Sequence, residues 1–221
     1  MEPAGFITDI LIPALSQGLV VTLQLIVLSA PFGLLLGIGI SLGRQYGGKT
    51  LSNFCKLYVI FIKGCPLLLL LFILYFGLPS IGITLTAFAA SVIGFILCNA
   101  AYNSEYIRGA ILSVKDGQTI AAQALGMTKW QVIREVILPQ ALRRAIPGLS
   151  NEFIYLIKYS SLAYMLTVIE LSGAGKLVAT KYFAYNEVFI AVGIVYLALV
   201  TFTTVAVHYL EKRVAVPGMI H

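Results

Sequence analysis

Residues 10–43 read ILIPALSQGLVVTLQLIVLSAPFGLLLGIGISLG and contain no charged side chain. An α-helix needs about 20 consecutive apolar residues to cross a membrane, so this longer stretch predicts a membrane-spanning helix. The whole chain of 221 residues has the same character, with 59% hydrophobic residues, 11% charged residues and a mean hydropathy of +0.94. A soluble domain carries about 25% charged residues. The composition therefore excludes a soluble domain, a disordered chain and a disulfide scaffold, and it predicts an all-α polytopic membrane protein.

The remaining apolar segments predict four more spanning helices. Residues 64–104 are again uncharged, but Gly77, Pro79 and Gly82 divide them into two spans joined by a tight turn. The fourth span is needed to keep the basic clusters on one side of the membrane, although it contains two charged residues. We expect spans at residues 10–43, about 54–77, about 84–112, about 146–168 and 188–210 within one transmembrane domain covering residues 1–221.

Basic residues gather on one side of this predicted topology. They occupy the first loop, the third loop and the segment after the last span, and they are Arg44, Lys49, Lys56, Lys115, Lys129, Arg134, Arg143, Arg144, Lys212 and Arg213. The opposite side carries only Lys176 and Lys181. Because cytoplasmic loops are enriched in Lys and Arg, we expect the amino terminus outside and the carboxyl terminus in the cytoplasm. The net charge of +6 then reflects topology and indicates no binding of nucleic acid.

Residues 43–50, GRQYGGKT, match the G-x-x-x-x-G-K-[ST] pattern of a phosphate-binding loop. Such a loop follows a buried strand and begins a helix in an α/β domain, whereas this one follows a membrane helix. We interpret it as a glycine-rich basic turn and expect no nucleotide or other cofactor to bind this chain. No Cys/His cluster has metal-ligand spacing, so no metal site is predicted either.

Small residues recur every four positions along the first span, at Ser29, Gly33, Gly37 and Ser41. A stripe of this kind lets a second helix backbone approach closely. Two interpretations are open: packing within the chain, and packing against another subunit.

The loop at residues 115–144 is longer than most connections in helix bundles, which favours a functional role. Gly126 is expected to end a first short helix, and Thr128 with Gln131 fits a capping box at the start of a second. The second helix is expected to end at Pro139. The first helix has an apolar face of Ile120, Ala121, Ala124 and Leu125. This pair of helices could lie on lipid, cover the bundle or dock into a groove of a partner.

The sequence GQTIAAQALGM at residues 117–127, followed by Leu138 and Pro139, resembles the EAA loop of ABC importer permeases. Further matches at residues 64–68, 74–79, 101–110 and 158–162 are similar to the permeases for polar amino acids, and the resemblance covers about residues 16–213. Two positions depart from it: Ile120 replaces the glutamate that gives the loop its name, and Tyr159 replaces an acidic residue that is common there.

The resemblance implies a membrane-spanning importer subunit in the inner membrane of a prokaryote. Its partners would be two ABC ATPase subunits that bind ATP and Mg, a second permease copy or paralogue, an extracytoplasmic solute-binding protein and the lipid membrane. The residues expected to couple to the ATPase are Gly117, Ala121, Ala122, Gly126, Met127, Thr128, Leu138 and Pro139.

Polar and charged residues within the predicted spans are the candidates for the substrate path, because charges in a membrane are costly. They are Asn99, Tyr102, Glu105, Arg108, Lys158, Ser160 and Ser161, with Glu152 and Tyr106 beside them. A zwitterionic amino acid needs both a cation and an anion or carbonyl groups around its head group. Alternative roles are a structural Glu105–Arg108 pair, a Lys158 side chain that reaches the interface, and ordinary packing of the tyrosines.

Two other functions fit a polytopic membrane protein. An ion-coupled carrier would need broken helices or an inverted repeat, and neither is clear in the sequence. A membrane enzyme would need a nucleophile with a base, or a metal cluster, and none is evident. We therefore expect a permease with no catalytic residues of its own.

Overall fold

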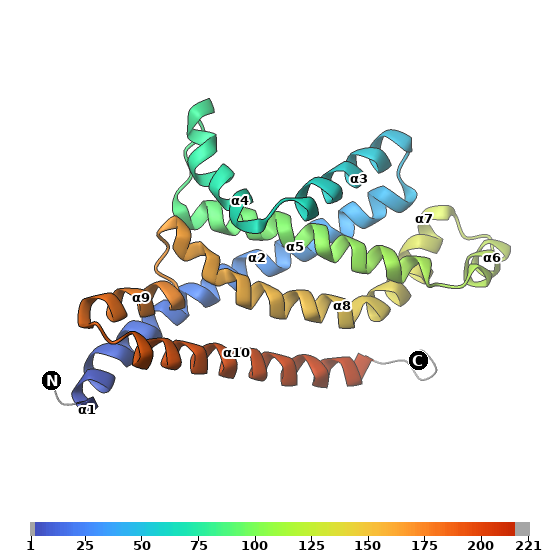
Figure 1. The fold of residues 1–221 in the computed structure, drawn as a ribbon. Coiled ribbons are helices and arrows are strands. Elements are labelled where there is room, and N and C mark those ends of the chain that lie inside the picture. The colour runs from blue at the N-terminus through green and yellow to red at the C-terminus, as the bar shows by residue number, and fades with distance from the viewer. Residues whose placement is uncertain (1–2, 215–221) are drawn as a thin grey trace.

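The computed structural model describes residues 3–214, which form a helical bundle without a strand (Figure 1). Its longer helices are α2 (Ile12–Tyr46), α3 (Lys49–Gly64), α5 (Ala87–Leu112), α8 (Leu138–Tyr159), α9 (Leu171–Tyr182) and α10 (Tyr185–Val214). The shorter ones are α1 (Pro3–Phe6), η1 (Ile7–Leu11), α4 (Leu67–Phe72), η2 (Ile73–Gly77), η3 (Leu78–Ile81), α6 (Asp116–Ala124), α7 (Lys129–Gln131), η4 (Val132–Ile137) and η5 (Ser160–Leu166). The all-α prediction is confirmed for the described residues.

Three helical segments are long and apolar enough to cross a membrane without a break: Ile7–Tyr46, Ala87–Leu112 and Tyr185–Arg213. They confirm the first, third and fifth predicted spans. Two bent pairs pass the same test, so the described residues hold between three and five spans.

The second predicted span, about residues 54–77, is wrong as a single helix. The segments Lys49–Gly64 and Leu67–Ile81 meet at an angle of 104°. Pro66 has no backbone N–H and forces the preceding Cys65 into an extended conformation, with φ −92° and ψ 129°. The lack of clear broken helices in the sequence was one argument against an ion-coupled carrier. The break at Pro66 removes that argument.

The expected helix end at Pro139 is also wrong. A π-helical turn, η4, runs directly into α8, and Pro139 occupies the first turn of that helix. The π-helical turn carries the chain past the proline, because the Leu138 N–H bonds to the Ile133 carbonyl, five residues earlier, and the Gln140 side chain donates to the Val136 carbonyl. The fourth span therefore starts earlier than the predicted residue 146, and a bend of 51° separates its end from α9.

Helices α2 and α5 form the most extensive pairing of the bundle. The stripe of Ser29, Gly33, Gly37 and Ser41 is buried in this seam. A Cβ on Gly33 would overlap the side chain of Asn99, and a Cβ on Gly37 would lie 2.9 Å from that of Asn103. The stripe therefore serves packing within the chain, the first of the two interpretations.

Helix α9 was not predicted, and a buried carboxylate organises its start. Glu170 caps the helix by accepting hydrogen bonds from the backbone N–H groups of Ser172 (2.9 Å) and Gly173 (2.8 Å). Its other donor is the hydroxyl of Tyr196 on α10, at 2.9 Å. The N–H of Leu171 donates to the Thr22 hydroxyl of α2, at 3.1 Å. These bonds join α9 to α2 and α10.

The elements separate toward two ends of the bundle. The turn between α2 and α3, the helices α6 and α7, and the last turn of α10 lie at one end, whereas α1 and α9 lie at the other (Figure 1). The first end carries Arg44, Lys49, Lys115, Lys129 and Lys212. This arrangement is compatible with the predicted orientation, which stays a prediction.

Candidate functional site

The short helices predicted in the loop at residues 115–144 are α6 and α7, followed by η4, and we call residues 116–137 the elbow. Gly126 adopts φ +81°, a left-handed conformation that favours glycine, and it ends the first helix. The Thr128 hydroxyl accepts from the N–H of Gln131 at 3.4 Å, and the Gln131 side chain accepts from the N–H of Thr128 at 2.8 Å. The helix end and the capping box are both confirmed.

One side of the elbow packs on the bundle. Ala122 of α6 is buried with Val132 and Ile137 of η4, and this cluster includes Ile107 and Ile111 near the end of α5. Met127 packs against the same cluster. The elbow is therefore attached to α5 and α8 through apolar contacts.

The other side of the elbow is apolar and uncovered. Ile120, Leu125 and Trp130 are 65%, 84% and 68% exposed. The predicted coupling residues divide between the two sides: Gly117, Ala121, Gly126, Thr128 and Pro139 are exposed, Met127 and Leu138 are half-buried, and Ala122 is buried. The expectation that the helix pair covers the bundle therefore holds for only one side of the elbow.

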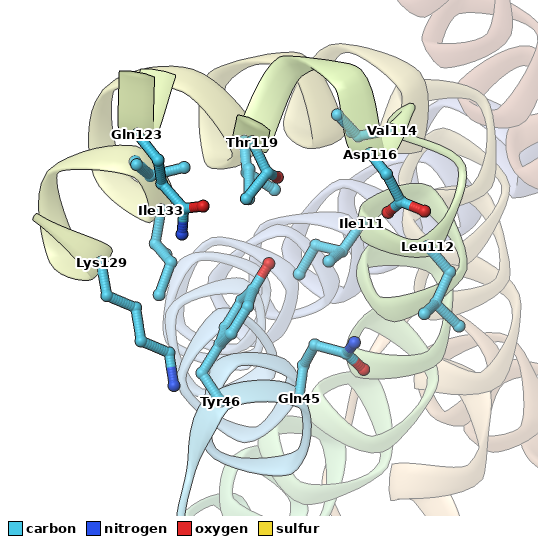
Figure 2. A pocket seen from close by; sticks show the side chains of 12 residues that line it. Gln45, Tyr46, Ile111, Leu112, Val114, Asp116, Thr119, Gln123, Lys129 and Ile133 are labelled. Atoms are coloured by element: carbon cyan, nitrogen blue, oxygen red, sulfur yellow. The ribbon is translucent and has the colours of Figure 1, made fainter. Parts of the chain in front are cut away.

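A cavity of about 320 Å³ lies between the elbow and the ends of α2 and α5 (Figure 2). Its polar lining comes from Gln45, Tyr46, Asp116, Thr119, Gln123 and Lys129. Beside this cavity α6 is held through the buried Ala122. This cavity could not be predicted from the sequence, because its walls come from segments far apart in the chain.

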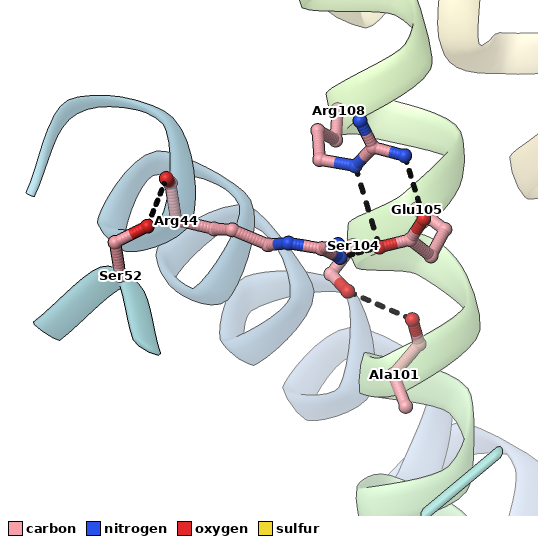
Figure 3. A network of polar contacts seen from close by, with 6 residues as sticks. All are labelled: Arg44, Ser52, Ala101, Ser104, Glu105 and Arg108. Carbon is pink, nitrogen blue, oxygen red and sulfur yellow. Dashed lines mark hydrogen bonds and ion pairs between the residues drawn. The ribbon is translucent and has the colours of Figure 1, made fainter. Parts of the chain in front are cut away.

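A charge cluster joins α2 and α5 (Figure 3). The Arg108 guanidinium donates to Glu105 at 2.8 Å, which is the expected pair. Arg44 of α2 also binds the Glu105 carboxylate, and the Ser52 hydroxyl donates to the Arg44 carbonyl at 2.8 Å. Sequence reasoning missed Arg44, since 61 positions separate it from Glu105. This geometry favours the structural role for the pair.

A second polar cluster lies deeper, between α5 and α8. Glu152 is only 3% exposed, and its Oε1 accepts from the Tyr159 hydroxyl at 3.0 Å and from the Asn99 amide at 3.5 Å. The Asn103 amide donates to Asn99 Oδ1 at 2.7 Å. Tyr159, which departs from the family pattern, thus contacts the buried carboxylate directly.

Lys63 was missed by sequence reasoning, although it is a charge inside the second span. Its Nζ lies 5.0 Å from the centre of the Tyr102 ring, just before the break at Pro66. The signal that could have found it is a lysine beside a Gly-Cys-Pro interruption of an apolar segment.

Three other path candidates do not join the deeper cluster. Lys158 is exposed and lies over the ring of Tyr155, 5.3 Å from its centre. The hydroxyls of Ser160 and Ser161 donate to carbonyls three residues earlier, so both serve their own helical turn. The structure thus brings Asn99 to Glu152, places Tyr102 against Lys63, and leaves Lys158 outside.

Comparisons with known proteins agree with this architecture. The family described as "Binding-protein-dependent transport system inner membrane component" matches residues 29–216. The probable amino-acid ABC transporter permease protein YckA of Bacillus subtilis is 42% identical, over 92% of this chain and 90% of its own. The glutamine transport system permease protein GlnP of Escherichia coli is 33% identical, over 93% and 94%.

A solved structure supports the same assignment. The crystal structure of an amino acid ABC transporter with histidines has a TM-score of 0.85 and 32% identity, over 91% of this chain and 94% of that one. These relatives are transport permeases and not enzymes, and nothing among them favours an ion-coupled carrier. The chain belongs to the binding-protein-dependent transport system inner membrane component family, and it is a multi-pass permease subunit of an ABC importer.

Proposed function

We propose that this chain forms the translocation path for an amino acid in a prokaryotic inner membrane. It has five spans, with the amino terminus outside and the carboxyl terminus in the cytoplasm. The observation that carries the proposal is the similarity, over nine-tenths of the chain, to permeases named for amino acids, glutamine and cystine. The basic end of the bundle supports the orientation.

The elbow receives the force of the ATPase. Its exposed apolar residues Ile120, Leu125 and Trp130 supply a docking surface, and the buried Ala122 transmits displacement to α5 and α8. Gly117, Ala121, Gly126, Thr128 and Pro139 lie on the accessible side. ATP and Mg bind in the ATPase subunits, while this chain holds no cofactor.

The complete importer contains two ATPase subunits, a second permease copy or paralogue, and a solute-binding protein outside. The substrate path follows α5 and the facing helices. The residues predicted for it from the sequence are Asn99, Tyr102, Glu105, Arg108, Lys158, Ser160 and Ser161. Among these, Asn99 and Tyr102 have the strongest support, because they lie beside the membrane-embedded charges Glu152 and Lys63.

The test is co-purification from the native membrane, followed by reconstitution in lipid vesicles with a panel of amino acids. We expect uptake of at least one amino acid that requires ATP, the ATPase and the binding protein together. A proton gradient without ATPase should drive no uptake. Uptake under that gradient would support an ion-coupled carrier and contradict the proposal.

A further inference from the structure

The junction between α5 and α6 is a short break in the helical structure. Helix α5 ends at Leu112, and α6 begins at Asp116. Lys115 between them is extended, with φ −64° and ψ 134°, and its side chain does not cap the first N–H groups of α6. Residues outside a helix bend more easily than those inside one, because fewer backbone hydrogen bonds hold them. We call residues 113–115 the hinge.

The elbow is connected to the bundle by two covalent routes that differ in stiffness. On one route η4 runs into α8 without a break. On the other route α6 reaches α5 only through the hinge. A displacement of the elbow therefore passes directly along α8, whereas bending of the hinge absorbs it on the way to α5. Transmission to α5 needs a contact that holds the hinge against a neighbouring helix.

Arg144 of α8 makes such a contact. Its Nη1 donates to the Ser113 carbonyl and, at 2.9 Å, to the Ser113 hydroxyl. The hydroxyl in turn donates to the Ala110 carbonyl at 2.7 Å, within the last turn of α5. The guanidinium thus joins the first residue of the hinge and the end of α5 to α8, across 31 positions in the chain.

The end of α5 favours a cation at this place. The last carbonyl groups of a helix have no partner within it and carry a partial negative charge, which a guanidinium stabilises. Hydrogen bonds from a charged donor are also stronger than neutral ones. The Arg144 Nε is buried without a hydrogen-bond partner, so the contact depends on Nη1. A lysine ammonium at this position is therefore able to replace it.

The apolar packing at the same place lacks the direction of this contact. Ala110, Ile111 and Val114 belong to one buried cluster with Ala141 and Ala145 of α8. Hydrophobic contacts are non-directional, so they resist separation of the helices more than sliding. A hydrogen bond weakens steeply when its angle changes. The arginine therefore fixes the hinge in a way that the apolar cluster does not.

We propose that Arg144 is a positioning residue for coupling, which holds the hinge against α8 so that the ends of α5 and α8 follow the elbow together. This inference rests on the proposed function and adds to it a residue outside the docking surface. Without the Arg144 contact the ATPase still docks and hydrolyses ATP, but part of the displacement is lost in the hinge.

The test uses the complete importer reconstituted in lipid vesicles, with uptake and ATP hydrolysis measured on the same preparation. Arg144→Met keeps an unbranched apolar side chain and removes the donor. We expect uptake per ATP hydrolysed to fall about tenfold, because a hydrogen bond to a charged group is worth about that factor. This ratio does not depend on how much of the complex has folded, so a purely structural loss leaves it unchanged. Arg144→Lys should restore most of the ratio.

Two matched variants separate the contact from the loss of a charge. Arg143→Met removes the neighbouring exposed cation and should leave the ratio unchanged. Ser113→Ala removes the hydroxyl but keeps the carbonyl acceptor, so the ratio should fall less than in Arg144→Met. Hydrogen exchange gives a second readout. The Val114 amide donates to the Ile111 carbonyl at the hinge, and it should exchange faster in Arg144→Met than in Arg143→Met.

An unchanged ratio in Arg144→Met would overturn the inference. Uptake and hydrolysis that fall in parallel would do the same, because the arginine would then only stabilise the fold. An equal fall of the ratio in Arg143→Met would assign the effect to charge alone and would also contradict it. In each case the wild-type importer still takes up substrate, so the proposed function stands. Absence of ATP-driven uptake by the wild-type importer for every amino acid would instead contradict the proposed function itself.

Discussion

The α2–α5 seam and the elbow are both rich in glycine and alanine, yet these small residues do different work in the two regions. At Gly33 and Gly37 an added Cβ would press on α5, so the absence of a side chain permits close packing. At Gly117 and Gly126 an added Cβ would meet nothing within 4 Å. Gly126 is needed instead for its backbone conformation, at φ +81°. The small residues of the seam stabilise the bundle through close helix packing. Those of the elbow contribute little packing and leave an accessible surface.

The largest effect is expected in the seam. Gly33→Leu inserts a side chain where Asn99 already lies, so α2 and α5 must separate. Overpacking of this kind costs about 3 kcal/mol of unfolding free energy. Thermal unfolding in detergent measures it. Gly39→Leu is the matched control, because Gly39 lies on the exposed side of α2 with nothing within 4 Å. Equal stability of the two variants would contradict the packing of the seam.

A smaller effect is expected at the charge cluster that joins the same helices. Glu105→Gln leaves Arg44 and Arg108 without their shared carboxylate. The side chains are 21–30% exposed, so solvent screens part of the interaction and we expect a loss of about 1–2 kcal/mol. Glu135→Gln is the control, since the Arg134–Glu135 pair is exposed and should contribute almost nothing. If Glu105→Gln left the unfolding free energy unchanged in the same assay, the cluster would have no structural role.

At the elbow we expect a loss of about 1 kcal/mol from Gly126→Ala, because a side chain is disfavoured at φ +81°. The same substitution at Gly117, inside α6 and without positive φ, should be neutral or slightly stabilising. Hydrogen exchange of α6 and α7 amides separates the two variants better than global unfolding does. Faster amide exchange in Gly117→Ala than in Gly126→Ala would contradict the requirement for glycine at Gly126.

Substitution of Leu125 should have the smallest effect on the unfolding free energy but a large effect on transport. Its side chain is 84% exposed, so Leu125→Asp should change the unfolding free energy by no more than about 0.5 kcal/mol. ATP-driven uptake should nevertheless fall at least about tenfold, because a charge would enter an apolar docking surface. Leu125→Met preserves the surface and should keep transport. Normal uptake by Leu125→Asp would show that the ATPase docks elsewhere.

Properties that depend on one segment could be predicted from the sequence. The uncharged segment at residues 10–43 has to be helical in lipid, since only a helix satisfies its own backbone groups there. The capping box at Thr128 and the helix end at Gly126 are equally local. These predictions hold because the interacting groups lie within four residues of one another.

What the sequence could not predict depends on distant partners or on competing local rules. Pro66 breaks a helix while Pro139 does not: Cys65 before Pro66 is extended, whereas Leu138 before Pro139 stays helical at the end of the π-helical turn η4. The contact partners of Arg44 and Lys63 lie on α5, which is far from both residues in the chain. For the candidate site, the sequence identified Asn99, Tyr102 and Glu152 as polar residues in the membrane, but not which of them meet.

The Glu170 cap also constrains the order in which the protein is assembled in the membrane. The carboxylate and the first N–H of α9 are satisfied by Tyr196, which is synthesised later, and by Thr22, which is synthesised much earlier. Until α10 enters the lipid, this acidic group lacks one of its donors. The start of α9 therefore cannot be completed in the order of synthesis. Its cap gains the last hydrogen bond only when α10 is inserted.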